Sequence, residues 1–243
     1  MACVLSTRPR EDALIDAEVL ARSGIDCLPA PMMRIVPLNI DIDVLFDDID
    51  ADAVALTSRH AVSFIAGTRW AEKPVFCVGE STARLAREAG MTDVTAGDGD
   101  GQGLVELIST TSCKSIFWPS AVDVGFDLDQ PLADHNVRLH RHSVYKAEKT
   151  HELPDAVINA LAQGDVSAVL VHSGRAGAHL VDVLGQNNLS YVQSNIDIVS
   201  VSARVAGHCG DGWRNIIVAQ KPRRKAMFDA IIKIMNTHQK NDL

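Results

Sequence analysis

Short apolar runs alternate with segments of helical spacing along most of this chain. Ala53–Leu56, Val75–Val78 and Ala168–Val171 are continuous apolar runs, the pattern of strands buried on both faces of a parallel sheet. Between such runs the apolar residues recur at helical intervals, for example over Ser81–Ala89 and Ala176–Leu184. Strands that alternate with helices indicate right-handed βαβ crossovers, so the pattern predicts an α/β fold with parallel sheets.

The same reasoning assigns the rest of the chain. The other predicted strands are Cys3–Leu5, Ile25–Val36, Val94–Thr95, Ser115–Trp118, Val137–Tyr145, Ile196–Val201 and Asn215–Ala219. The other predicted helices are Asp12–Ser23, one beginning near Val44, Ala61–Gly67, Gly103–Thr110, Leu128–His135, Asp155–Gln163, Ala203–Cys209 and Arg224–Asn236. The glycine-rich segment Asp98–Gly103 is predicted to be a flexible surface loop.

Two strand-and-turn segments occur twice. Ala53–Val62 is echoed by Ala168–Gly177, and Val75–Ala83 is echoed by Ile198–Ala206 at a similar offset, which indicates two related α/β halves. The second half lacks a strand unless Cys3–Leu5 belongs to it. The sequence therefore predicts a discontinuous domain of residues 1–34 and 147–243, with residues 37–143 inserted as a second domain.

Two segments are predicted to carry the chain between these domains. Ile25–Val36 contains three prolines when its flanking Pro37 is included and reads as an edge or a connector, whereas Val137–Tyr145 is polar and alternating. We expect these two segments to pair as a two-stranded β linker and to allow the domains to move relative to one another.

Composition narrows the function classes. The chain has 243 residues, 47% of them hydrophobic, with a formal net charge of -8, which argues against nucleic acid as a partner. The five cysteines form no C-x-x-C pair, so zinc sites and disulfide frameworks lose support. The histidines His135, His140 and His142 fit an exposed strand better than a metal site. No apolar run is long enough to span a membrane, and we expect a cytoplasmic protein.

Small hydroxyl residues, several next to an arginine, follow the predicted strands. A single one is explained by N-capping of the next helix, but together they indicate an anion-binding cleft between the domains at the strand ends. His60 and His172 lie beside these residues, and each either binds a carboxylate when protonated or fills a turn. The candidate binding residues are Thr7, Arg8, Thr57, Ser58, His60, Ala61, Gly79, Glu80, Ser81, Thr82, Ser173, Gly174, Arg175 and Ser202.

Tyr145, at the end of the predicted return strand, is either a packing residue or a proton donor. No Walker loop and no G-x-G-x-x-G motif occurs, so nucleotide binding and phosphate handling are weakly supported.

The order and spacing of these motifs resemble the uroporphyrinogen-III synthase family. The resemblance rests on Thr7-Arg8-Pro9, Thr57-Ser58-x-x-Ala61-Val62, Val78-Gly79-x-x-Thr82-Ala83, Val144-Tyr145 and Ser173, and it extends from Cys3 to the last helix. The chain departs from the family pattern at Ser202–Ala206, which lacks the Gly and Thr of G-x-x-T-A. It departs again at Trp118–Ser120, in a turn that usually bears Arg or Gly.

The resemblance implies two flavodoxin-like α/β domains and a monomeric lyase without cofactor or metal. The implied reaction is cyclisation of the linear tetrapyrrole hydroxymethylbilane with inversion of ring D. By the same resemblance, Tyr145 assists the loss of the hydroxyl as water, and Ser58 and Thr82 line the site, largely through backbone amides. The alternative is a two-domain protein that binds a small anionic ligand without catalysis.

Overall fold

The chain folds into two α/β units. The computed structural model describes residues 2–241, with side chains to residue 237, so residues 1 and 242–243 of the predicted first domain lie outside the described residues. One unit, unit 1, contains the chain up to Arg34 and from Glu148 onward, and unit 2 contains Ile35–Ala147. The chain passes between the units within β3 (Met33–Pro37) and β8 (Arg138–Lys149), which are neighbours in one sheet.

The elements follow the predicted alternation. Unit 1 contains β1 (Cys3–Ser6), α1 (Arg10–Ala21), β2 (Asp26–Pro29), α7 (Asp155–Gln163), β9 (Val166–Val171), α8 (Gly174–Gln186), the 3-10 helix η3 (Ser190–Asn195), β10 (Asp197–Ser200), α9 (Ala203–Ala206), β11 (Asn215–Val218) and α10 (Arg224–Asn241). Besides most of β3 and β8, unit 2 contains α2 (Ile42–Asp48), β4 (Ala53–Leu56), the 3-10 helix η1 (Arg59–Ala61), α3 (Val62–Ile65), the 3-10 helix η2 (Arg69–Glu72), β5 (Val75–Cys77), α4 (Glu80–Glu88), β6 (Val94–Ala96), α5 (Gly101–Ser109), β7 (Ser115–Ala121) and α6 (Asp129–Ala133).

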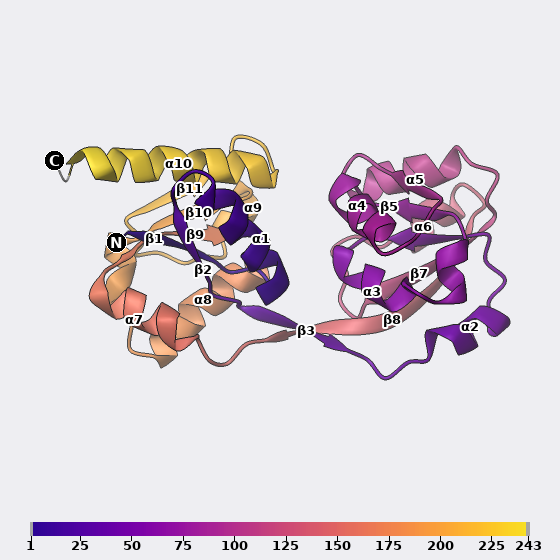
Figure 1. Ribbon diagram of the computed structural model, residues 1–243, viewed down its shortest axis with the longest axis horizontal. Helices are drawn as coiled ribbons and strands as arrows, with labels where there is room; N and C mark the ends of the chain where they lie inside the picture. Colours follow the sequence, from indigo (N-terminus) through magenta and orange to yellow (C-terminus); the bar gives the residue numbers. More distant parts are fainter. Residues whose placement is uncertain (1, 242–243) are drawn as a thin grey trace. The chain divides into compact units, whose positions relative to one another are not determined.

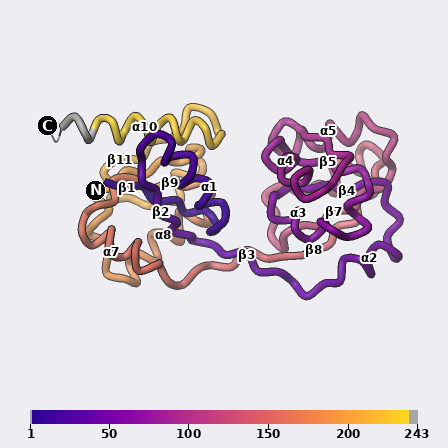
Figure 2. The backbone as a smooth tube through the Cα atoms, viewed as in Figure 1, coloured from indigo at the N-terminus to yellow at the C-terminus, as the bar shows by residue number. Residues whose placement is uncertain are grey.

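The sheet of unit 1 has the order β11-β10-β9-β1-β2, and all neighbouring strands are parallel. β1 pairs with β9 on one side and with β2 on the other, so the prediction that Cys3–Leu5 completes the sheet of the second half is confirmed. In the tube view the N-terminal segment lies beside strands from late in the chain (Figure 2). Numbered along the chain within the unit, this is the flavodoxin order 2-1-3-4-5.

The sheet of unit 2 has the order β3-β8-β7-β4-β5-β6, and the pairs from β8 to β6 are parallel. Its five parallel strands correspond to those of unit 1 when β4-β5-β6 is matched with β9-β10-β11, and β7-β8 with β1-β2. The echoed segments begin on matching strands, β4 with β9 and β5 with β10. The two sheets thus share one strand arrangement, and the chain enters it at a different strand in each unit.

Helices cover both faces of the sheet in unit 1 because alternate strand residues are apolar on each face. Leu5, Val169 and Val171 pack with α7 and α8. Val4 and Leu170 point the other way and pack with α1 and α10. In Figure 1, α10 lies on one side of the strands of this unit and α7 and α8 lie on the other.

The same alternation builds the core of unit 2. Val54 and Leu56 of β4 pack with α3 and α4, whereas Ala53 and Ala55 pack with α5 and α6. Two separate apolar clusters therefore hold the sheet from both faces.

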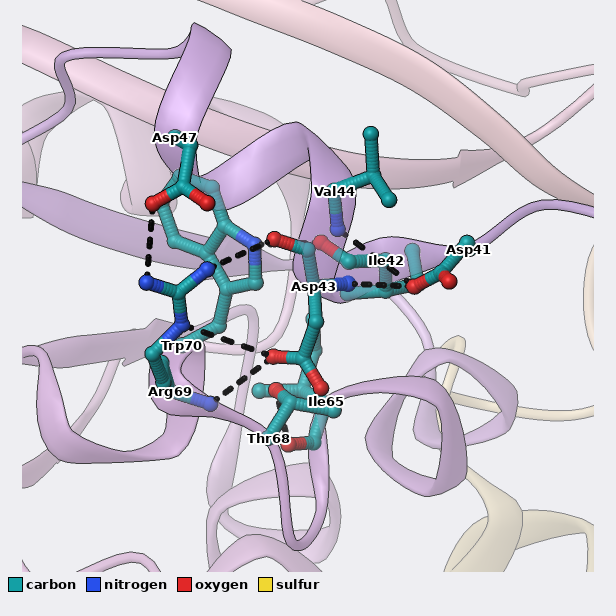
Figure 3. A network of polar contacts seen from close by, with 9 residues as sticks. All are labelled: Asp41, Ile42, Asp43, Val44, Asp47, Ile65, Thr68, Arg69 and Trp70. Carbon is teal, nitrogen blue, oxygen red and sulfur yellow. Dashed lines mark hydrogen bonds and ion pairs between the residues drawn. The ribbon is translucent and has the colours of Figure 1, made fainter.

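A polar network fixes α2 to the core of unit 2 (Figure 3). The guanidinium of Arg69 donates to the Asp47 carboxylate at 2.8 Å and to the Asp43 carbonyl oxygen at 2.9 Å. The buried Trp70 indole donates to the Ile42 carbonyl at 3.0 Å. The hydrogen bond from Arg69 lowers the pKa of Asp47 below its ordinary value. The first helix of the unit is thus held to η2, although α2 itself is short.

The prediction that Ile25–Val36 forms a single extended segment is wrong. It divides into β2, at the edge of one sheet, and β3, at the edge of the other. Pro29 ends β2 and Pro31 lies between the two strands. Proline has no backbone N–H to donate to a neighbouring strand, so it favours the end of a strand. The predicted pairing with the return strand is confirmed for β3 only.

Two strand ends also differ from the prediction. β7 continues through Trp118–Ser120 to Ala121, so these residues are strand and not a turn. The pairing with β4 covers only Ile116 and Phe117 of β7, and Pro119 lies beyond it, where its missing N–H costs little. β8 continues to Lys149, so Tyr145 does not end the return strand.

The segment Asp98–Gly103 is not a flexible loop. It follows β6, and Asp100 caps α5 by accepting from the Gly103 amide at 2.8 Å. Gly97 and Gly99 donate their amides to carbonyls at the end of β5. The predicted helices Ala61–Gly67 and Ala203–Cys209 shorten to α3 and α9, where Gly67 and Gly207 fall at or just beyond the last turn.

The cysteines are free in the structure, and burial raises the pKa of the Cys27 and Cys77 thiols to about 12. These thiols stay protonated and act as small apolar groups. Among the described residues, no helix combines the length and apolar character needed to cross a membrane.

Candidate functional site

The candidate residues lie at the carboxyl edges of the two sheets. Because all the strands that carry them are parallel within each unit, the loops that follow them emerge at one edge. The strand order reverses between β1 and β9 in unit 1 and between β4 and β7 in unit 2. Open parallel sheets bind ligands outside the carboxyl ends at such switch points.

In unit 2 the loops at this edge are tied to one another. Trp118 of β7 donates its indole Nε1–H to the Thr57 hydroxyl at 3.0 Å, which links the two strands at the switch point. Ser58 accepts from the His60 amide at 3.2 Å and thereby caps η1. A Cβ at Gly79 would lie 3.0 Å from the Gly99 Cα, so a larger residue would push the loops after β5 and β6 slightly apart.

The start of α4 has no capping side chain, because its N-cap residue is Gly79. Glu80 and Ser81 are exposed, whereas Thr82 is buried, and Glu80 pairs with Arg87 at 2.9 Å. A helix of this length with an uncapped first turn presents backbone amides to an anion.

A bulge in β8 sets the position of Tyr145. Ser143 pairs with Ser120 and Tyr145 with Ala121, so Val144 is an extra residue in this parallel pair. Neighbouring residues of a regular strand point to opposite faces, yet Val144 and Tyr145 both bury in the same apolar cluster. The Tyr145 ring stacks on Phe64 with centroids 5.9 Å apart and meets the His60 ring edge-on at 6.1 Å. The bulge therefore brings Tyr145 beside η1 and α3.

Arg141 is a residue that the sequence analysis did not single out. Its guanidinium donates to the Ser120 hydroxyl at 3.0 Å and to the carbonyls of Ala121 and Val122 at 3.2 and 2.9 Å. It also lies over the Trp118 ring, 5.1 Å from the centroid. Arg141 thus fixes the end of β7. Strand alternation puts Arg141 on the face opposite to His140 and His142, and its pairing with Trp118 in the β7–β8 register puts these two side chains on the same face.

In unit 1 the hydroxyl residues mainly serve the local backbone. Thr7 donates its amide and its hydroxyl to the Leu170 carbonyl at 3.3 and 2.8 Å, joining β1 to β9. Ser173 and Ser202 accept from Ala176 and Val205 amides at 3.2 and 3.3 Å and cap α8 and α9. The predicted capping interpretation is confirmed for both serines.

Arg8, the arginine predicted to bind an anion after β1, is instead paired with carboxylates of its own chain. Arg8 forms ion pairs with Asp12 at 2.7 Å and with Asp16 at 3.2 Å. Burial raises the pKa of Asp16, while hydrogen bonds from Ser6 and the charges of Arg8 and Arg224 act in the opposite direction. The positive charge of Arg8 is therefore largely offset within unit 1.

His172 stays neutral at the switch point of unit 1. Burial, reinforced by the charges of Arg8 and Arg224, lowers its pKa to about 3. Both ring nitrogens are buried, and neither has a hydrogen-bond partner among the described residues. A protonated, carboxylate-binding His172 is therefore not supported by the structure.

Gly174 and Arg175 begin α8, and Arg175 is exposed. A Cβ at Gly174 would lie 2.5 Å from the ring of His208, an exposed histidine that the sequence analysis missed. Among the side chains that the structure describes, up to residue 237, no three from His, Cys, Asp or Glu gather as a metal-binding group. His140 instead hydrogen-bonds the Ser115 hydroxyl at 3.0 Å, and partial burial lowers its pKa.

Comparison with models of protein families assigns the chain to a family. The family model HEM4, described as uroporphyrinogen-III synthase HemD, matches residues 16–229. The chain belongs to the uroporphyrinogen-III synthase family. The resemblance stated from the strand-end motifs is therefore confirmed. A comparison with curated proteins gave no significant match.

Solved structures of proteins named uroporphyrinogen-III synthase or synthetase share the fold. The uroporphyrinogen-III synthetase of Helicobacter pylori aligns with a TM-score of 0.63 at 14% identity, covering 96% of this chain and 100% of that one. A mutant uroporphyrinogen III synthase of Thermus thermophilus aligns with a TM-score of 0.53 at 16% identity, covering 98% and 100%. At these identities the likeness concerns the fold, and it supports the predicted architecture of two parallel-sheet α/β units.

Within unit 2 the structure brings together Thr57, Ser58, His60, Ala61, Gly79, Glu80, Ser81, Thr82 and Tyr145 at or beside one edge. Within unit 1 it brings together Thr7, Arg8, Ser173, Gly174, Arg175 and Ser202. This member of the uroporphyrinogen-III synthase family thus has two such edges, one on each unit.

Proposed function

We propose that this protein is a uroporphyrinogen-III synthase that cyclises hydroxymethylbilane to uroporphyrinogen III, with inversion of ring D. The observation that carries the proposal is the family match over residues 16–229. The reaction breaks a carbon–oxygen bond and releases water, so the enzyme is a lyase under this proposal.

The substrate carries acetate and propionate carboxylates around its rim, and we propose that the carboxyl edges of both sheets contribute to binding it. In unit 2 the uncapped first turn of α4 after Gly79 offers backbone amides. In unit 1 the hydroxyl of Ser173 is already used as a cap, and Arg8 is paired with Asp12. Backbone amides therefore suit the carboxylates better than the side chains predicted from the sequence.

Tyr145 is the proton donor in this proposal. Its phenol gives a proton to the terminal hydroxyl, the carbon–oxygen bond breaks, and water leaves. Ring D attacks the resulting azafulvene through its substituted α carbon, and the older bond from that carbon to the ring C methylene then breaks. The freed methylene bonds the other α carbon of ring D, which inverts the ring, and the proton lost from that carbon replaces the one that Tyr145 gave. The bulge at Val144 and the contacts with Phe64 and His60 hold the ring, so orientation supplies much of the rate.

The alternative, a protein that binds a small anionic ligand without turnover, is not favoured by the family match. Incubation with enzymatically generated hydroxymethylbilane, followed by identification of the uroporphyrin isomer, separates the two. Faster formation of the type III isomer than in a protein-free control supports the synthase, and a type I product at the uncatalysed rate contradicts it.

The sequence also leads us to propose a monomer that acts in the cytoplasm on a small molecule, with no metal or cofactor in the reaction. Protonation and ring closure need a proton donor and a shaped site, which the chain's own residues supply under this proposal.

A further inference from the structure

The loop that follows β7 exposes two apolar side chains at the carboxyl edge of unit 2. Val122 is 47% exposed and Phe126 is 39% exposed. From the same loop, Val124 and Leu128 pack into the apolar cluster beneath it. The loop is therefore anchored in the core, and its two outward side chains remain available for another contact.

The Phe126 ring lies on the first turn of α5. A Cβ on Gly101 would fall 2.3 Å from the Phe126 Cδ1, so this position accepts only glycine while the ring stays in place. α5 begins shortly after β6, which places the ring beside the glycine loop that touches Gly79.

Backbone bonds join the same loop to the candidate site. The Val122 amide donates to the Tyr145 carbonyl at 2.9 Å, and Arg141 holds the Ala121 and Val122 carbonyls. By the match of strand orders, this loop is the counterpart of the Thr7–Pro9 loop after β1 in unit 1. It therefore occupies a binding position of the fold, although its residues differ.

The acidic residues close to Phe126 in the chain or at the start of α5 disfavour a carboxylate against the ring itself. Asp98 and Asp100 lie just before Gly101 in the chain, and Asp127 follows Phe126 directly. The face of a pyrrole ring is compatible with this aromatic surface when the acetate and propionate groups of that ring point away from the aspartates.

We propose that Phe126, with Val122, forms an apolar docking surface for the face of a pyrrole ring of the linear tetrapyrrole. This inference rests on the proposed function and assigns the residues that receive the ring system, as distinct from the carboxylate rim. Phe126 is then a residue that binds substrate through its ring.

The test measures KM, kcat and the isomer ratio with hydroxymethylbilane for Phe126→Ala, Phe126→Leu and Gly101→Ala. We expect Phe126→Ala to raise KM by roughly 3–30-fold, because an aromatic contact and its buried area are lost. Phe126→Leu should retain part of the affinity, and Gly101→Ala should raise KM because the new Cβ displaces the ring.

Tyr191→Ala is the matched control. Tyr191 is an aromatic residue 64% exposed in η3 of unit 1, before the amino end of β10. Its removal should leave KM unchanged. If thermal denaturation shows that both proteins are folded, equal KM values for wild type and Phe126→Ala overturn the inference. Absence of turnover by the wild type contradicts the proposed function instead, so the two failures are distinct.

Discussion

Tyr145 is 5% exposed and stacked on Phe64, so a phenylalanine fits in its place without a new cavity. If its hydroxyl protonates the leaving group, Tyr145→Phe should slow turnover by roughly 10²–10⁴-fold, the range usual for a general acid. Steady-state rates with hydroxymethylbilane, together with the product isomers, measure this effect.

An unchanged rate for Tyr145→Phe rejects Tyr145 as the acid. A normal rate with more type I isomer assigns it a role in guiding ring closure. Phe64→Leu separates positioning from proton donation, because it removes the ring that stacks on Tyr145 and keeps the Tyr145 hydroxyl.

His172 makes folding stability depend on pH. Its pKa is about 3 in the folded protein and near the ordinary 6.5 when unfolded, so between these values only the unfolded chain binds the proton. The free energy of unfolding should therefore fall as pH decreases from about 6.5 toward 3, by up to about 1.4 kcal/mol per pH unit. Asp16, with its raised pKa, acts in the opposite direction.

Urea denaturation at several pH values tests this prediction. His172→Leu should show a shallower loss of stability on acidification than wild type, and His135→Leu, at an exposed histidine, is the control. Identical slopes for wild type and His172→Leu contradict the assigned role.

At the scale of elements, Arg141 of β8 adds side-chain hydrogen bonds to the backbone pairing that holds the end of β7. Arg141→Met removes three hydrogen bonds to Ser120, Ala121 and Val122. Because these groups are partly solvated, we expect a loss of about 1–3 kcal/mol in the free energy of unfolding. Arg138→Met, on the same strand and exposed, should change it by less than about 0.5 kcal/mol. Equal effects of the two substitutions would show that Arg141 does not hold the strand end.

The alternation of elements could be predicted because apolar runs and helical spacing are local signals. The bulge at Val144 and the strand through Pro119 could not, since both depend on which neighbour a strand pairs with. The glycine segment Asp98–Gly103 was misread for a similar reason. Its glycines permit close contact with the loop after β5, and composition alone does not distinguish this from flexibility.

For the whole molecule, the repeat predicted two related halves, and the sheets show a shared order with different entry points. The strand-end residues could be predicted because parallel strands end at one edge. The pairing of Arg8 with Asp12, the neutral His172 and the Arg141 contacts could not, because each depends on side-chain orientation, on burial or on residues far apart in the chain.

The isomer of uroporphyrinogen formed by the whole protein is the most direct test of the account. Hydroxymethylbilane loses its hydroxyl readily and closes unaided to the type I isomer, so the type III isomer requires a site that directs ring D. We expect the wild-type protein to yield predominantly type III, faster than the protein-free reaction. A type I product at the protein-free rate, from folded protein, would contradict the central claim.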